Sequence, residues 1–260
     1  MKIIQISDAH IVAGTDSLQG LAPRERLRRC VADINANHAD ADLCAVTGDL
    51  TDAGDMAAYA EFRRIIAELT VPVQLMIGNH DSRINFVRAF PETETDSNGF
   101  VQSSRQIGGC SLIFLDTNEP GTHSGAYCDL RQKWLQSQLD ALPKERPVYL
   151  FLHHQPFPIG WPALDEIGLI HADELQGILR KYPNLKYILF GHIHRTVTGC
   201  WNGIPFSAIP GTNHQIRWGK GGESEIVYTK ESPAYNVIYI NGDVTMIYQK
   251  PFDLDIEPGA

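Results

Sequence analysis

The stretch KIIQISDAH at residues 2–10 joins a short apolar run to an acidic residue and a histidine. A run of this length, rich in isoleucine, predicts a strand at Lys2–Ser7 that is buried on both faces. Two later stretches repeat the pattern, AVTGDLTD at residues 45–52 and QLMIGNHD at residues 74–81. Each of these two places an apolar run directly ahead of a glycine and of polar side chains, so the strand ends are where chemistry is expected.

Helical patterns separate these runs. Apolar residues recur every three or four positions in Pro23–Asn37, and Asp55 has the place of a helix N-cap. Asp129 is expected to cap a helix that runs to Leu142, with Gln132 completing a capping box. Further strands are predicted at 43–47, 73–77, 111–115, 148–152 and 187–190, and further helices at 82–90 and 173–182. This alternation predicts an α/β layered core with parallel strand pairing.

The last quarter of the chain changes character. Four short apolar runs at 197–200, 204–209, 236–240 and 244–249 predict strands joined by tight turns. Asn202-Gly203 and Asn241-Gly242 are typical of β-hairpins, because both residues tolerate a positive φ. We therefore expect one domain over 1–260, with a β-rich C-terminal part at 197–250.

Composition narrows the class of protein. The chain has 260 residues, and 22 basic against 31 acidic residues give a net charge of -9. Without a long basic run, a binder of extended nucleic acid or of anionic membranes is disfavoured. No apolar run approaches the roughly 18 residues of a membrane span. The five cysteines are odd in number and lack a CxxC pair, which predicts reduced thiols and a cytoplasmic protein.

The polar residues after the strands share one chemistry. Imidazole, carboxylate and amide oxygen together suit Mn, Fe, Zn or Co, whose ligand preferences overlap. Residues i and i+2 of an extended chain point the same way, which predicts that Asp8 with His10, and His192 with His194, each present two donors. Seven candidate donors follow strands: Asp8, His10, Asp49, Asn79, His153, His192 and His194. One tetrahedral ion uses about four ligands, so seven donors are more than a single ion needs. Their number fits two ions that share a bridging carboxylate.

Each donor alone has an ordinary explanation as a turn residue, a helix cap or a hydrogen-bonded surface histidine. Their joint occurrence at successive strand ends favours a metal centre. Four neighbouring residues, His154, Asp52, Asp81 and Asp116, are equally consistent with supporting the ligands and with a structural role. Arg83 and Arg195 flank the motifs, where a phosphate contact and a solvated surface position are both open.

The ordered blocks resemble the calcineurin-like metallophosphoesterase superfamily, whose motifs are DxH, GDxxD, GNHD/E, a histidine near a strand end, and GHxH. Here they are Asp8-Ala9-His10, Gly48–Asp52, Gly78–Asp81, His153 and Gly191–His194. The resemblance implies a four-layer α-β-β-α sandwich of two mixed sheets, here with C-terminal β-hairpin additions.

The resemblance also implies roles at the site. Asp8, His10 and His194 would bind one metal ion, Asn79, His153 and His192 the other, and Asp49 would bridge both. His80 is not a ligand in the family but lies near the leaving group, where it would act catalytically. The alternative for His80 is that it orients Asn79 or a neighbouring carboxylate.

The chain is similar to the branch with class III cyclic-nucleotide phosphodiesterases and bacterial glycerophosphodiesterases. This implies hydrolysis of small phosphodiesters by a metal-bound hydroxide. A phosphomonoesterase or nuclease of the same superfamily is the first alternative, and a non-catalytic binding scaffold is the second. Turn-rich segments at 154–171 and 211–225 are expected pocket walls, where Trp161 or Trp218 would stack on a base or simply pack. The expected partners are a small phosphodiester and a second copy of the chain, without membrane or extended nucleic acid.

Overall fold

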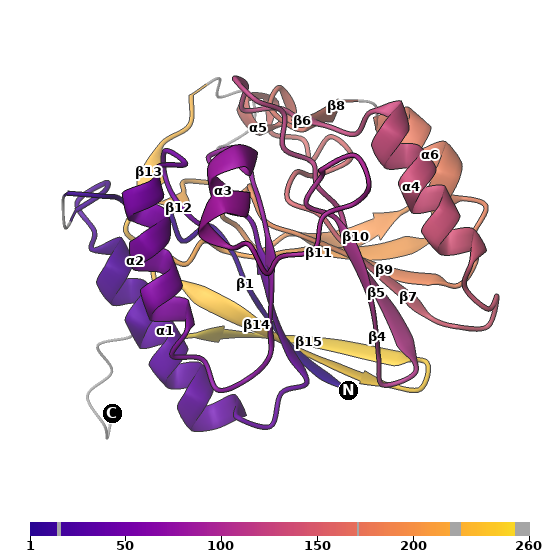
Figure 1. Ribbon diagram of the computed structural model, residues 1–260, viewed down its shortest axis with the longest axis horizontal. Coiled ribbons are helices and arrows are strands. Elements are labelled where there is room, and N and C mark those ends of the chain that lie inside the picture. The colour runs from indigo at the N-terminus through magenta and orange to yellow at the C-terminus, as the bar shows by residue number, and fades with distance from the viewer. Residues whose placement is uncertain (15–16, 171, 219–224, 253–260) are drawn as a thin grey trace.

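Two mixed β-sheets face each other at the centre of the computed structural model, which describes residues 1–14, 17–170, 172–218 and 225–252 (Figure 1). The five-stranded sheet has the order β15 (Val244–Pro251), β14 (Ala234–Asn241), β1 (Lys2–Ile6), β2 (Leu43–Thr47) and β3 (Val73–Met76). The six-stranded sheet has the order β10 (Thr198–Trp201), β11 (Ile204–Ala208), β9 (Leu185–Phe190), β7 (Val148–Phe151), β5 (Cys110–Phe114) and β4 (Ser103–Ile107). The predicted architecture of two mixed sheets is confirmed.

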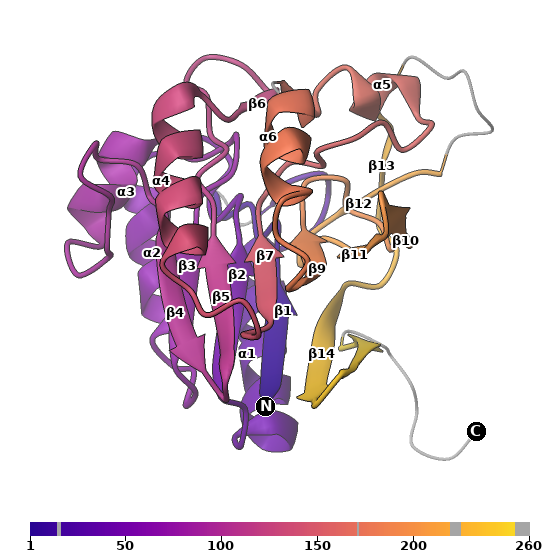
Figure 2. The ribbon, with the colours of Figure 1, turned by 90° about the vertical axis from the view of Figure 1, so that its right-hand side faces the viewer.

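Helices cover the outer faces of both sheets. On the five-stranded sheet lie α1 (Pro23–His38), α2 (Met56–Ile66) and α3 (Arg83–Ala89). On the six-stranded sheet lie α4 (Asp129–Asp140) and α6 (Ala172–Leu179), in front of the strands in Figure 2. The remaining short elements are α5 (Pro162–Asp165), the parallel pair β6 (Gly125–Ala126) and β8 (Leu169–Ile170), and the antiparallel pair β12 (Gln215–Ile216) and β13 (Tyr228–Thr229).

Alternation along the strands explains why they are apolar on both faces. Ile3 of β1 packs with Phe114 and Phe151 between the two sheets. Its neighbour Ile4 packs with Leu27 in the layer below the outer helices. Every central strand therefore separates two buried layers, which makes its run of apolar residues continuous rather than alternating.

Strands β1, β2 and β3 run parallel, as do β5, β7, β9 and β11. In Figure 2 the N-terminus lies at the bottom, and the loops that follow the parallel strands gather at the top. The carboxyl ends of both sheets thus meet at one edge, where the predicted donors lie. No described helix is long and apolar enough to cross a bilayer.

Local details both confirm and correct the expectations. Asp55 caps α2 by accepting the Ala58 N–H at 2.9 Å, as predicted. The capping box at α4 was wrong: the N-cap is Cys128, and Gln132 Nε2 donates to the Tyr127 carbonyl instead. Strand β4 was missed because its sequence, SSRQI, is that of a polar edge strand with mixed burial.

Candidate metal centre

Left-handed turns after the strands carry most of the predicted donors. Asp8, His10, Asp49, His192 and His194 all have positive φ, between 46° and 66°. For residues other than glycine this conformation costs about 1–3 kcal/mol each and clusters at functional sites. The expectation that paired donors lie on extended backbone was therefore wrong, although the pairs do converge. The backbone turns sharply just past each strand and aims the side chains inward.

Two glycines make room for the donors. A Cβ on Gly78 would lie 2.2 Å from Asp49 Oδ1 and 2.6 Å from His153 Nε2. A Cβ on Gly191 would lie 2.1 Å from Ser7 Oγ and 2.9 Å from Asp8 Oδ2. Since no Cβ fits at such distances, these glycines are required by the donors packed against them.

Replacing Gly78 with alanine is expected to lower bound metal and to reduce kcat/KM by about 10–100-fold, because the new methyl group displaces Asp49 and His153. Metal content and turnover should be measured on the folded variant. Gly177→Ala is the matched control, since nothing lies within 4 Å of a Cβ at Gly177. A Gly78→Ala variant with the native metal content would contradict this view of the site.

The first donor group contains Asp8, His10, Asp49 and His194, all buried. His194 Nε2 lies 3.3 Å from His10 Nε2 and 3.4 Å from Asp8 Oδ1. His10 Nε2 lies 3.6 Å from Asp49 Oδ2. Two ligand atoms that each lie about 2.0–2.2 Å from the same ion are separated from one another by distances like the three just given. This group of side chains therefore fits a divalent cation.

The second donor group adjoins the first through Asp49. His153 Nε2 lies 3.3 Å from Asp49 Oδ2 and 3.2 Å from Asn79 Oδ1. The His192 ring is 5.2 Å from that of His153. Asp49 Oδ2 is therefore next to one imidazole of each group. All seven predicted donors converge, while the role of each in binding metal stays a prediction.

Hydrogen bonds on the far side of each imidazole set which nitrogen faces the centre. His153 Nδ1 donates to the Thr47 carbonyl at 2.7 Å, and His194 Nδ1 to the His214 carbonyl at 2.7 Å. His10 Nδ1 lies 3.1 Å from Asp52 Oδ1. These contacts leave Nε2 of each ring for the centre, as outer partners of metal ligands do.

His192 is oriented the other way round. Its Nε2 lies 3.1 Å from the Ile167 carbonyl, which leaves Nδ1 for the centre. Burial is the main cause that lowers the pKa of His192 and of His10, so both rings are neutral and able to bind metal.

His80 lies beside the donors without joining them. Its backbone N–H donates to Asp49 Oδ1 at 2.9 Å, its Nδ1 to the Asp52 carbonyl at 2.8 Å, and its ring lies 4.7 Å from that of His10. Burial by itself lowers the pKa of His80, but the negative charges of Asp49 and Asp52 and the bond to the Asp52 carbonyl raise it overall. A raised pKa favours the protonated imidazole, which at the rim of a cavity suits a proton donor.

The supporting residues hold the loops. Asp81 accepts from the backbone N–H groups of Leu50 and Gly78, and burial raises its pKa to about 6. Asp116 forms an ion pair with Arg83 at 2.6 Å, so that arginine is not directed at a substrate. Arg195 pairs with Glu231, and His154 Nδ1 lies 2.8 Å from Thr117 Oγ1.

A cavity of about 140 Å³ opens above the donors. Beside the donors, its lining contains the imidazoles of His80 and His123 together with larger, mainly apolar side chains: Leu164, Ile167, Ile216, Ile226 and Tyr228. The sequence analysis missed His123, whose Nδ1 lies 3.1 Å from Asn79 Nδ2. Its place in a loop that follows a strand is the signal that could have identified it. Neither Trp161 nor Trp218 is among the residues lining this cavity; their rings pack on each other, with Trp218 63% exposed.

The chain is similar to known proteins both in sequence and in structure. Residues 1–196 match the family described as calcineurin-like phosphoesterase. A probable cyclic nucleotide phosphodiesterase of Rhodopseudomonas palustris is 36% identical, over 98% of this chain and 94% of its own length. A probable glycerophosphodiester phosphodiesterase of Arcobacter nitrofigilis is 30% identical, over 92% of this chain and 88% of its own length. A dimetal phosphatase from Danio rerio shares the fold, with a TM-score of 0.73, 14% identity and 96% of each chain covered.

Proposed function

The chain belongs to the calcineurin-like phosphoesterase family, and on this premise we propose that it hydrolyses small phosphodiesters at a dinuclear metal centre. The proposal assigns Asp8, His10 and His194 to one ion, Asn79, His153 and His192 to the other, and Asp49 to both. The observation that carries it is the position of Asp49 Oδ2, 3.6 Å from His10 Nε2 and 3.3 Å from His153 Nε2. A carboxylate so placed suits a bridging ligand.

Two divalent ions bound here, from among Mn, Fe, Zn and Co, would supply a hydroxide nucleophile near neutral pH and would neutralise phosphate charge. The residues add the rest. Asp8 and Asp49 contribute -2 against +4 from the ions, so a hydroxide leaves about +1 for an anionic diester. A chain of net charge -9 thus still attracts a phosphodiester locally.

His80 is proposed to protonate the departing alkoxide. Its Nδ1 is held by the Asp52 carbonyl, which leaves Nε2 for the substrate. Its place on the cavity lining supports a position beside the leaving group of a bound diester.

Among diesters we propose cyclic nucleotides as substrates, with glycerophosphodiesters as the second candidate. The relative named for cyclic nucleotides has the higher identity of the two compared, 36% against 30%. The cavity lining combines metal-binding and imidazole side chains with the larger side chains of Tyr228 and Ile226, as a phosphate joined to a nucleoside requires.

A substrate panel tests this directly. The protein, loaded in turn with Mn, Co, Zn or Fe, is assayed on 3′,5′- and 2′,3′-cyclic nucleotides, glycerophosphodiesters, and bis-p-nitrophenyl and p-nitrophenyl phosphate. Faster turnover of the diesters, with cyclic nucleotides first, is the expected result. Preference for the monoester would instead favour a phosphomonoesterase.

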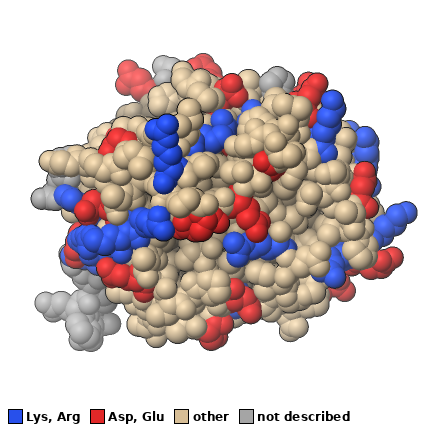
Figure 3. Space-filling model, viewed as in Figure 1, with Lys and Arg blue, Asp and Glu red and all other residues tan. Residues whose placement is uncertain are grey.

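A nuclease and a non-catalytic scaffold have less support. On the face seen in Figure 3, basic and acidic side chains are interspersed, whereas a nuclease groove would be continuously basic. A scaffold without catalysis is expected to lose donors, and here seven converge. Location in the cytoplasm and assembly into a dimer or higher oligomer remain proposals. None of the five cysteines forms a disulfide, which suits a reducing compartment.

Metal affinity is expected to rise with pH up to about 9. In the metal-free chain, burial lowers the pKa of His153, but the charge of Asp49 outweighs burial and raises it to about 9. A metal ion must displace the His153 proton, so below that pH each unit increase should strengthen binding of the second ion about tenfold. Chelator competition with Co²⁺ between about pH 7 and pH 10, corrected for the chelator, measures it. Affinity independent of pH over this range would contradict the assignment.

A further inference from the structure

Strand β15 is a free edge of the five-stranded sheet and the longest edge strand in the described part of the chain. It spans eight residues, whereas the edges β3 and β10 span four residues each and β4 spans five. From Val244 to Gln249 it carries no charged side chain. Proteins protect a sheet edge with short strands, charges or proline, so a long uncharged edge indicates a strand that pairs with a partner.

The backbone of β15 directs hydrogen-bonding groups away from β14. Ile240 of β14 donates its N–H to the Met1 carbonyl at 2.9 Å and accepts from the Met1 amino group at 3.0 Å, so it does not bond to Thr245 opposite. Bonded and non-bonded pairs alternate along an antiparallel ladder. Every second residue of β15 therefore presents one N–H and one C=O to the free edge, and no described residue bonds to these groups: Thr245, Ile247 and Gln249.

The outer face of the same strand exposes apolar side chains. Val244 is 55% exposed, Met246 40% and Tyr248 56%. Helix α1 reaches only the far end of the strand, where Lys250 donates to Asp33 at 2.8 Å. In Figure 1 the β14–β15 hairpin extends past α1 at the bottom of the molecule. Apolar side chains beside unpaired backbone groups are typical of an interface.

A second copy of β15 satisfies these backbone groups when the two strands run antiparallel about a two-fold axis at Ile247. Ile247 then faces its own copy, and Thr245 faces Gln249 of the second copy on each side of the axis. Each outward N–H meets a C=O in this register. A shift by two residues leaves one of the outward residues without a strand partner.

The same register also matches the side chains of the outer face. Met246 lies opposite Tyr248 of the second copy, and both thioether–aromatic and cross-strand apolar contacts are favourable. Val244 lies opposite Lys250, whose alkyl stem can cover it. Lys250 is the one charged residue of β15, so no like charges face each other across the axis.

We propose that the chain forms a symmetric dimer through β15, which joins the two five-stranded sheets into one continuous sheet. Both copies use the same surface, as a two-fold interface requires. A contact made by one strand from each copy is small compared with that of an obligate dimer, so the association is reversible, with a dissociation constant in the micromolar range. The inference goes beyond the proposed function and does not depend on it.

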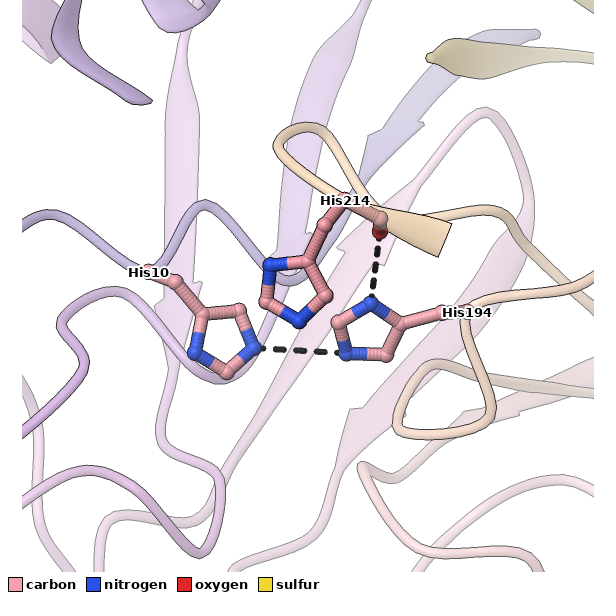
Figure 4. A group of neighbouring side chains, drawn as sticks. All are labelled: His10, His194 and His214. Atoms are coloured by element: carbon pink, nitrogen blue, oxygen red, sulfur yellow. Dashed lines mark hydrogen bonds between the residues drawn. The ribbon is translucent and has the colours of Figure 1, made fainter. Parts of the chain in front are cut away.

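The dimer leaves the metal centre of each copy open. Ile247 is level with Ile238, which pairs with Ile3 near the amino end of β1. The donors instead follow the carboxyl ends of the strands, and Figure 4 shows three imidazoles gathered there from separate loops. Each copy is therefore complete as a site, and dimerisation is not required for turnover.

Sedimentation equilibrium of the full chain between about 5 µM and about 500 µM is expected to show monomers in exchange with dimers. Met246→Lys/Tyr248→Lys sets lysine against lysine on both sides of the axis and should weaken the dimer at least about 100-fold. Ile84→Lys/Leu130→Lys is the matched control, since it adds the same charge at exposed apolar positions of α3 and α4 and should keep the native association.

Met246→Lys/Tyr248→Glu tests the register. It sets lysine against glutamate on both sides of the axis, so it should associate more strongly than the double-lysine variant. A chain that stays monomeric over the whole range, or a dimer that the double-lysine variant leaves intact, would overturn the inference. A charge-paired variant no stronger than the double-lysine one would overturn the register. If either variant fails to fold, sedimentation of the native chain decides alone, and none of these outcomes depends on catalysis.

Discussion

Asp49→Ala is expected to lose both metal ions and to lower kcat by at least about 10⁴-fold. Asp49 is the one donor whose carboxylate oxygen lies beside an imidazole of each group, His10 on one side and His153 on the other. Its removal takes one ligand from each proposed ion and one negative charge from between them. The hydroxide nucleophile depends on both ions. Loss of this one shared ligand should therefore lower kcat about as much as loss of the whole centre would. Metal content and kcat on the best diester measure the effect.

Two further variants make the test of Asp49 specific. Asp49→Asn keeps the side-chain volume and an acceptor for the His80 N–H, now 2.9 Å from Asp49 Oδ1, but removes the charge. It should fold normally and still lose most bound metal. Asp96→Asn is the control for altering a buried aspartate, because Asp96 holds the N–H groups of Asn98 and Phe100 in another loop. A fully metallated, active Asp49→Ala protein would exclude a bridging role.

His80→Asn is expected to lower kcat by about 10²–10⁴-fold while both metal ions stay bound. The loss should depend on the leaving group. A diester that releases an alkoxide needs the proton and should suffer the full effect, whereas one that releases p-nitrophenolate needs it far less. Steady-state kinetics on a cyclic nucleotide and on bis-p-nitrophenyl phosphate, with metal content measured on the same samples, give the comparison.

An orienting role for His80 predicts a different outcome. If the ring only orients Asn79 or a carboxylate, the two substrates should lose activity equally and metal binding should weaken. His38→Asn serves as the control, since His38 lies in the last turn of α1, packs on Tyr235 and belongs to neither donor group. Equal losses on both substrates would rule out His80 as the proton donor.

Much of the fold followed from local patterns. The strand at Leu43–Thr47 is as predicted, and most other predicted elements differ from the observed ones by a few residues. These strands are buried on both faces, so their apolar runs are continuous and easy to recognise. Edge strand β4 lacks that signal because its polar sequence meets solvent on one side. The capping box at α4 is wrong because Asp129 is the first helical residue and Cys128 is the N-cap, while Gln132 Nε2 donates to the Tyr127 carbonyl.

The sequence by itself determined which side chains follow the strands and hence the seven donors, because strand ends and motif spacing are local properties of the chain. The residue pattern left the grouping of the donors to the family resemblance, and only the tertiary structure brings them together, since His10 and His194 lie 184 positions apart and meet only when the two sheets face each other. It also decided that left-handed turns, rather than extended backbone, aim the donors, and that the loops of His123 and His214 close over them. Such contacts depend on the packing of whole layers, which no local pattern encodes.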